Sequence, residues 1–113
     1  MALKEDVQKA VKGVDIILQY AAVTTGIKDV INKPYIHVTD NAIMNSVILR
    51  SAFKNKVKKF IFFSCSVMYN SSKFGIKEND FKEHNNITDK YFGVAWTKIY
   101  IEKMCEFYSN LNT

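Results

Sequence analysis

Residues 58–69 read Lys58-Lys59-Phe60-Ile61-Phe62-Phe63-Ser64-Cys65-Ser66-Val67-Met68-Tyr69. Two lysines lead into four apolar residues without polar alternation, and three small nucleophilic side chains follow at once. A short, continuous apolar run is typical of a strand that is buried on both faces, as in parallel sheets. In open α/β sheets, ligands bind just beyond the carboxyl ends of the strands. We therefore expect Ser64, Cys65 and Ser66 to lie at a binding site.

A second strand of the same kind is expected upstream. Residues 3–12 carry apolar side chains at helical spacing, and Gly13 follows where a helix C-terminal glycine belongs. Residues 14–20 then form a buried-strand candidate that runs into Ala21 and Ala22. These two small residues would let a ligand approach the backbone closely, although packing at a strand end explains them equally well.

A long helix over residues 35–54 is predicted between the two strands. Pro34 fits its first turn, where a missing N–H does no harm. The apolar residues expected to share its sheet-facing side are Ile36, Ile43, Met44, Val47, Ile48 and Ala52. Asn41 and Asn45 interrupt this pattern. Asparagine inside a helix is usually exposed, and the alternative is a hydrogen bond to the neighbouring strand end.

A polar stretch over residues 70–90 precedes the last predicted helix, residues 91–110. A loop of that length in a compact domain is usually functional or disordered. Thr88 or Asp89 can cap the helix that follows. Lys98 falls within the apolar stripe of this helix. A lysine in that position either extends its amine to the rim or is held for chemistry or ligand contact, and position alone does not decide.

The predicted order is helix, strand, helix, strand, long loop, helix, which gives an α/β fold built on a right-handed parallel β-α-β unit. Two parallel strands that are apolar on both faces cannot bury themselves with three helices and no neighbouring strands. We expect the open edges to be covered from outside these 113 residues. An internal piece of a larger α/β domain explains this better than pairing with other subunits does.

Composition argues against several classes of protein. The chain has 113 residues and a net charge of +5, with one dense group of lysines: Lys54, Lys56, Lys58 and Lys59. Such a group is usually the solvated turn between a helix and a strand, and without a nucleic-acid-binding signature we expect no nucleic-acid partner. No apolar run approaches the roughly 18 residues of a membrane span, and the N-terminus does not resemble a secretory signal, so no membrane partner is expected.

Cysteines and histidines do not predict a disulfide framework or a metal site. Cys65 and Cys105 lie in a strand end and a helix pattern, which favours a reducing compartment and a cytoplasmic protein. His37 and His84 have no ligand partners at metal spacing, so both are expected to face solvent.

Several segments, taken in order, resemble the extended short-chain dehydrogenase/reductases. More narrowly, they resemble the NAD-dependent epimerase/dehydratases of nucleotide sugars, with the GDP-L-fucose synthases among the nearer relatives. The matching residues are 14–22, Pro34, Asp40-Asn41, 60–69, Glu78, and Lys98 with Glu102. The resemblance covers about 100 residues, and the order and spacing of its motifs are more specific than any single motif.

The resemblance implies a partial Rossmann-like parallel sheet flanked by helices, with residues 1–113 as the central fragment of an NAD(P)-binding domain. It implies NAD or NADP as cofactor and a nucleotide sugar as substrate. A Ser/Thr, a tyrosine and a lysine carry the proton chemistry in such enzymes, while the nicotinamide moves hydride. A phenol with a pKa near 10 needs an adjacent positive charge to act at neutral pH.

Carried over to this chain, the catalytic candidates are Tyr91, Lys98 and the group Ser64, Cys65 and Ser66. The cofactor-binding candidates are Ala21, Ala22, Asn41, Phe63, Ser64, Cys65, Tyr91 and Lys98. The sequence contains no metal site among these residues, and no metal is expected.

Three departures separate this chain from the family pattern. No G-x-x-G-x-x-G turn for the pyrophosphate occurs in the sequence, and no downstream substrate domain is present in it. Cys65 stands at the position of the family serine, four residues before Tyr69. A thiol is a poorer donor than a hydroxyl, so a neighbouring serine can take the role, or the role is weakened.

The third departure is in the family's Tyr-x-x-x-Lys motif. Val94 stands four residues before Lys98, and the nearest preceding tyrosine is Tyr91. Seven helical residues separate two side chains by roughly 10 Å along the axis, so Tyr91 can cooperate with Lys98 only if the helix begins after it. Gly93 makes such a late start possible. The alternative is that Tyr91 packs and that the catalytic pair has been lost.

Two function classes follow. One is a segment of an NAD(P)-dependent nucleotide-sugar epimerase/dehydratase or epimerase-reductase. The other is a truncated, non-catalytic remnant that keeps a dimerisation or scaffold surface. In the family, helices matching residues 35–54 and 91–110 build a dimer interface, which implies a homodimer. Trp96, Tyr100 and Phe107 share a second face of the last helix and are compatible with that interface, although core packing is the ordinary interpretation.

Overall fold

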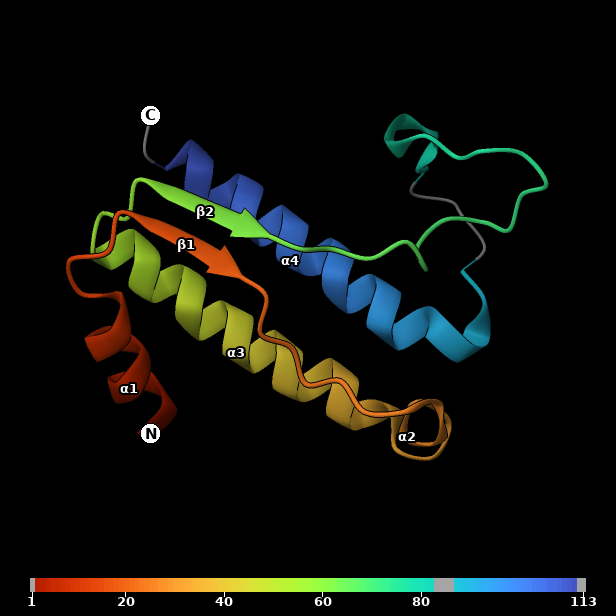
Figure 1. Cartoon of the computed structure of the whole chain (residues 1–113), viewed down its shortest axis with the longest axis horizontal. Coiled ribbons are helices and arrows are strands. Elements are labelled where there is room, and N and C mark those ends of the chain that lie inside the picture. The colour runs from red at the N-terminus through yellow and green to blue at the C-terminus, as the bar shows by residue number, and fades with distance from the viewer. Residues whose placement is uncertain (1, 83–86, 112–113) are drawn as a thin grey trace.

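Two parallel strands, joined through a long helix, form the centre of the computed structural model, which describes residues 2–82 and 87–111. Figure 1 shows the arrangement. In chain order the elements are α1 (Ala2–Val11), β1 (Ile16–Gln19), α2 (Ile27–Asn32), α3 (Pro34–Lys54), β2 (Lys59–Phe62), two 3-10 turns (Glu78–Asp80 and Asp89–Tyr91) and α4 (Phe92–Asn110). The order predicted from sequence is confirmed, and α2 is an addition that the polar residues around Gly26 did not suggest.

The strands pair in parallel, with Ile16 opposite Lys59 and Gln19 opposite Phe62. Gly13 ends α1 with a φ of 75°, a left-handed conformation that glycine adopts without strain and that reverses the chain into β1. The α/β class with a partial Rossmann-like sheet flanked by helices is therefore confirmed. Among the described residues the sheet has two strands.

All the covering helices lie on one side of this sheet. Figure 1 looks onto the strands, with α3 and α4 behind them, and the molecule is only 18 Å thick along that view. On the open side, Ile16 and Leu18 are each 54% exposed, and the rings of Tyr20 and Phe63 stack at 4.0 Å. The prediction that both strands are buried on both faces is therefore wrong for this chain, because one layer of helices covers one face only.

The side of α3 that faces the sheet is largely polar. Its buried residues include His37, Asn41 and Asn45, spaced four residues apart, followed by Leu49 and Ala52. Ile43, which was expected to face the sheet, is 42% exposed. The predicted apolar face is therefore confirmed at Ala52, which is buried, and wrong at Ile43, while the other predicted residues are half-buried. The most buried stripe of the first half of α3 is polar and is held by hydrogen bonds.

The main apolar core lies between the β2 strand end and α4. Met68, Ile87, Ala95 and Ile99 form a buried cluster, and Phe81 packs against it. Ile87 and Phe81 thus anchor the predicted loop over residues 70–90, although residues 83–86, including His84, lie outside the described part of the chain. No helix in the described residues is long and apolar enough to cross a membrane.

The start of α4 differs in detail from the prediction. Neither Thr88 nor Asp89 caps it through a side chain; Thr88 instead precedes a 3-10 turn, and α4 begins at Phe92. The backbone N–H of Tyr91 donates to the Thr88 carbonyl at 2.8 Å. This bond satisfies one of the backbone N–H groups near the start of the helix, which a capping side chain would otherwise accept.

Gly93 allows α3 and α4 to approach closely, and we expect Gly93→Ala to destabilise the fold. A Cβ built at Gly93 would lie 2.7 Å from Cγ2 of Val38, a stiff β-branched side chain. We expect a net loss of about 1–2 kcal/mol, because overpacking costs roughly 1–3 kcal/mol and the gain in helix propensity returns up to about 1 kcal/mol. The measurement is urea unfolding, with Gly26→Ala as control, since a Cβ at Gly26 meets open space. Equal unfolding free energies for the two variants would contradict the prediction.

Candidate active site

Lys98 extends from α4 to the carboxyl end of β2. Its Nζ donates a hydrogen bond of 2.9 Å to the Phe63 carbonyl oxygen and lies 4.6 Å from the centre of the Phe62 ring. The side chain is half-buried. The sequence left open whether Lys98 extends its amine to the rim or is held for ligand contact, and the structure has features of both. The aliphatic part of the side chain crosses the apolar layer, and the amine reaches the carboxyl end of β2. Partial burial lowers the pKa of Lys98, and the neighbouring Cys65 thiol opposes that shift.

Ser64, Cys65 and Ser66 line an open cavity of about 590 Å³ directly after β2. The other lining residues come from the following loop and from α4: Met68, Tyr69, Glu78, Phe81 and Glu102. The Tyr69 hydroxyl lies 3.3 Å from the Glu78 carbonyl oxygen, and the Tyr69 ring packs edge-on against Phe81. These contacts hold the loop against the strand end, so hydroxyl, thiol and carboxylate groups face one cavity.

Several groups around the Cys65 thiol shift its pKa in opposite directions. Burial raises its pKa, which hydrogen bonding to the Val67 backbone and the positive charge of Lys98 partly offset, while Glu102 adds to the rise. Cys105 also has a raised pKa, chiefly from burial and then from Glu102. Both cysteines are free thiols and remain protonated at neutral pH.

Tyr91 directly precedes α4, whereas this cavity's α4 contact, Glu102, lies in the middle of the helix. The place of Tyr91 before the helix is what cooperation with Lys98 requires. The cation over its ring, however, is the Lys90 amine at 5.1 Å from the ring centre. Tyr91 does not line the Ser64–Ser66 cavity. The structure thus brings together Lys98 and the strand-end residues, and the role of Tyr91 stays a prediction.

A second strand-end segment, residues 20–26, is held in place by the polar stripe of α3. Asn41 accepts a hydrogen bond from the Val23 N–H at 2.8 Å and donates one to the Val23 carbonyl at 3.0 Å. Thr25 Oγ1 lies 3.0 Å from His37 Nε2. Ala21 is exposed and Ala22 half-buried at the top of this segment. The α3 stripe therefore fixes the backbone that carries both alanines.

Gln19 joins the strand itself to the same stripe. Its amide donates to Asn45 Oδ1 at 3.1 Å and to the Ala21 carbonyl at 3.2 Å. The strand-end hydrogen-bond alternative for Asn41 and Asn45 is thus confirmed, and their exposed interpretation is wrong. His37 is also buried, so its predicted exposure is wrong. Direct cofactor contact by Asn41 stays a prediction.

The sequence did not predict the hydrogen bonds of Gln19 and Thr25 with α3, and it placed His37 in solvent. Glu102 was named only for its place beside Lys98 in the family pattern and not as a residue that lines a cavity. A usable signal existed for His37, because His37, Asn41 and Asn45 stand at i, i+4 and i+8 and so lie on one helix face. Gln19 gave no signal, since a single polar residue at the end of an apolar strand is ordinary.

Each of the two strand ends presents groups that could hold a ligand. Ala21 and Ala22 leave the backbone of the first strand end accessible, and the Lys98 amine stands at the second with one of its three donors used by Phe63. Contact of these residues with the ribose and nicotinamide of NAD(P), which the family resemblance implies, stays a prediction. The sequence holds no glycine-rich turn for the pyrophosphate.

Raised thiol pKa values predict a loss of stability at alkaline pH. A group whose pKa is higher in the folded protein stabilises it fully below the unfolded pKa, and that contribution is lost as pH rises through the folded pKa. For Cys65 and Cys105 the loss begins above about pH 8.5. We expect the double variant Cys65→Ser, Cys105→Ser to show a shallower fall of the unfolding free energy between pH 8 and 10. Parallel pH profiles for the variant and the wild type would contradict this.

Comparisons with known proteins identify the family and the fold of the chain. The family model described as "NAD dependent epimerase/dehydratase family" matches residues 1–112. No curated protein matches the chain significantly. A solved chain described as "DdhaC" has a TM-score of 0.80 at 18% identity, over 95% of this chain and 30% of that one. At that identity the likeness concerns the fold, and the present chain spans about 30% of the matched chain. Because the family match covers nearly every residue, the protein belongs to the NAD-dependent epimerase/dehydratase family, which generally uses NAD(P).

Proposed function

We propose that this chain supplies the strand-end half of the active site of an NAD(P)-dependent nucleotide-sugar epimerase/dehydratase or epimerase-reductase, similar to GDP-L-fucose synthase, in the cytoplasm. The observation that carries the proposal is the hydrogen bond from Lys98 Nζ to the Phe63 carbonyl, which holds a cation beside Ser64, Cys65 and Ser66. Membership of the epimerase/dehydratase family supports it.

Lys98 is proposed to hold the cofactor ribose and to supply positive charge. Its amine has three protons, and the Phe63 carbonyl accepts one of them, so two donors remain for a ligand. The Phe62 ring beneath the amine provides further stabilisation of the cation and limits its movement. Bound NAD(P) would supply the hydride acceptor and donor at this point.

Tyr91 is proposed as the general acid/base, with a hydroxyl of Ser64 or Ser66 as its hydrogen-bonding partner toward the substrate. Both serines are exposed at the cavity, whereas Cys65 is half-buried and protonated. A hydroxyl is the stronger donor, so the serines are better suited than the thiol to hold a sugar oxygen. Glu78 and Glu102 line the same cavity and can accept hydrogen bonds from sugar hydroxyls.

Binding and turnover measurements test the proposal. We expect the isolated chain to bind NADH weakly and to show no turnover, because it has no glycine-rich turn for the pyrophosphate. A longer polypeptide carrying these residues together with such a turn should oxidise or epimerise a nucleotide sugar with NAD or NADP. Titration by nicotinamide fluorescence gives the affinity, and a micromolar Kd for the isolated chain would contradict the first expectation. Failure of the longer polypeptide to bind either cofactor would contradict the proposal itself.

A non-catalytic dimerising remnant is the second candidate, favoured by one observation. Trp96, Tyr100 and Phe107 are 36%, 58% and 58% exposed on the outer face of α4, which is unusual for aromatic side chains of one helix. They would form a homodimer interface together with α3. Sedimentation of the wild type against Tyr100→Glu distinguishes the cases, since a dimer that dissociates in the variant supports this interface. A wild type that is monomeric at all concentrations would exclude it.

A further inference from the structure

A small hollow, the α1–α3 hollow, lies between α1 and the C-terminal half of α3, two helices that pack against each other (Figure 1). Its volume is about 40 Å³. One face of each helix lines it, with side chains at helical spacing: Lys4 and Gln8 from α1, and Val47, Arg50, Ser51 and Lys54 from α3. Three of these six residues are cationic and none is acidic, so positive charge surrounds the hollow.

The three cations of the α1–α3 hollow have no carboxylate partner in the described part of the chain. Lys4, Arg50 and Lys54 form no ion pair with any residue there. Lys54 stands in the last turn of α3, where the helix dipole favours a cation. Lys4, in contrast, stands in the first turn of α1, where the helix dipole disfavours one. A bound anion would offset both that unfavourable interaction and the repulsion among the three cations.

The Ser51 hydroxyl is a second, independent feature of the hollow. Ser51 is 3% exposed and lines the hollow. Its carbonyl accepts hydrogen bonds from Asn55, but its hydroxyl makes none with any described residue. Within that part of the chain no polar side-chain atom is fully enclosed without a partner, so the Ser51 hydroxyl keeps contact with the hollow. A buried hydroxyl with a free donor, beside three cations, is suited to an anionic acceptor.

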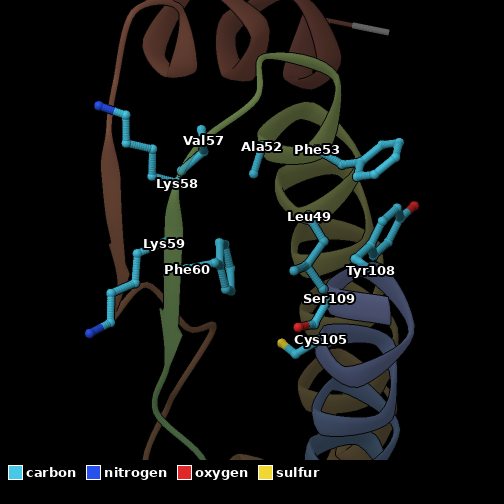
Figure 2. A pocket seen from close by; sticks show the side chains of 10 residues that line it. All are labelled: Leu49, Ala52, Phe53, Val57, Lys58, Lys59, Phe60, Cys105, Tyr108 and Ser109. Carbon is cyan, nitrogen blue, oxygen red and sulfur yellow. The ribbon is translucent and has the colours of Figure 1, made fainter. Parts of the chain in front are cut away.

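The dense group of lysines before β2 belongs to a different surface. Figure 2 shows the amines of Lys58 and Lys59 directed away from α3. Lys58 is also paired with Asp15 at 2.9 Å. Of that group, Lys54 alone lines the hollow. The hollow is therefore a compact cationic site, whereas a nucleic acid would need cations spread along its backbone.

We propose that the α1–α3 hollow binds a phosphate group with two negative charges, either free phosphate or a phosphate monoester. A guanidinium donates two parallel N–H bonds to two oxygens of such a group, and Arg50 is the only arginine in the sequence. Lys4 and Lys54 add positive charge. The Gln8 amide and the Ser51 hydroxyl are neutral donors for the remaining oxygen.

The size of the hollow fits the same ligand. A volume of 40 Å³ takes about three water-sized groups, because one of them needs roughly 10–15 Å³. A phosphate monoester presents three free oxygens of about that size, and its ester oxygen can point outward. A carboxylate presents two oxygens and one charge, so it would use fewer of the donors. The hollow shares no residue with the Ser64–Ser66 cavity, so the inference does not depend on the proposed function.

The test is an NMR titration of the whole, isotope-labelled chain with inorganic phosphate and with methyl phosphate, at pH 8 and constant ionic strength. We expect saturable shifts of the Gln8, Arg50 and Ser51 backbone amide signals with a millimolar Kd, while the Ile101 signal in α4 stays unchanged. Tighter binding of methyl phosphate identifies a monoester as the ligand, and any other order identifies free phosphate. Dimethyl phosphate has one negative charge and two free oxygens, so it should bind about tenfold more weakly or worse. Absence of saturable shifts with both phosphates, or equal affinity for dimethyl phosphate, would overturn the proposal.

Substitutions locate the binding. Arg50→Gln removes the guanidinium and should weaken phosphate binding by about tenfold or more, and Ser51→Ala should weaken it by about threefold or more. Lys9→Gln is the matched control, because it removes one positive charge from an exposed position of α1 that does not line the hollow, and it should change the Kd by less than about twofold. Circular dichroism checks that the variants fold, and Lys4→Gln replaces Arg50→Gln if the latter does not. Equal effects of Arg50→Gln and Lys9→Gln would indicate attraction by net charge alone and would overturn the proposal.

Discussion

Replacing Lys98 with alanine is expected to lower kcat by about two to four orders of magnitude in a polypeptide that carries this segment and turns over. General acid–base catalysis contributes about that much, and a cation at the strand end supports it in the proposed mechanism. The structure gives the reason for choosing Lys98, because its amine alone among the described lysines is bonded to a strand-end carbonyl beside the Ser64–Ser66 cavity. Rates are followed through the absorbance of the reduced nicotinamide.

Lys103→Ala is the matched control for that experiment. Lys103 lies on the same helix and pairs with Glu106 at 3.0 Å on the surface, where such an ion pair contributes little to stability. Its loss should change kcat by less than about twofold. Lys98→Arg refines the test, since it keeps the charge but changes the shape of the donor, and partial recovery of activity is expected. Equal effects of Lys98→Ala and Lys103→Ala would remove Lys98 from the site.

The positions of the strands and the order of the elements could be predicted from sequence, because short apolar runs ended by turn residues mark them. The run at residues 60–63 and the glycine at position 13 each produced the expected element. Burial could not be predicted in the same way. The apolar character of Ile16 and Leu18 indicates that their face is suited to being covered, but the sequence of these strands does not say which polypeptide covers it.

Residues of the candidate site could be proposed from sequence where the family pattern marks them, but hydrogen bonds between elements could not be predicted. The place of Lys98 in an apolar helical stripe did not decide its role, and it became a catalytic candidate through the resemblance to the epimerase/dehydratases. The hydrogen bonds of Gln19 with Asn45 and of Thr25 with His37 join residues 26 and 12 positions apart, and no local pattern records them. Apolar periodicity also missed the buried polar residues of α3, because it gives no weight to polar side chains that are buried and hydrogen-bonded.

Asn41→Leu is expected to cause a large loss of stability, although leucine keeps the branching of the asparagine side chain at Cγ. Asn41 is 7% exposed and makes three hydrogen bonds to backbone groups, two of them to Val23. Leucine has the same number of side-chain heavy atoms but leaves the Val23 N–H and carbonyl without their partner. An unsatisfied buried polar group costs about 1–3 kcal/mol, and Val23 is only half-buried, so we expect a loss of about 2–4 kcal/mol in the free energy of unfolding.

Hydrogen exchange distinguishes this cause from general destabilisation. If Asn41 clamps residues 20–26, the Val23 amide should exchange much faster in Asn41→Leu, by more than the change in global stability explains, while the Ile101 amide in α4 should follow global stability alone. Asn70→Leu, at an exposed loop position, is the control and should change the unfolding free energy by less than about 0.5 kcal/mol. An unchanged exchange rate at Val23 would mean that the segment carrying Ala21 and Ala22 is held by contacts other than the Asn41 amide. The polar stripe of α3 would then not be what positions this strand end for a cofactor.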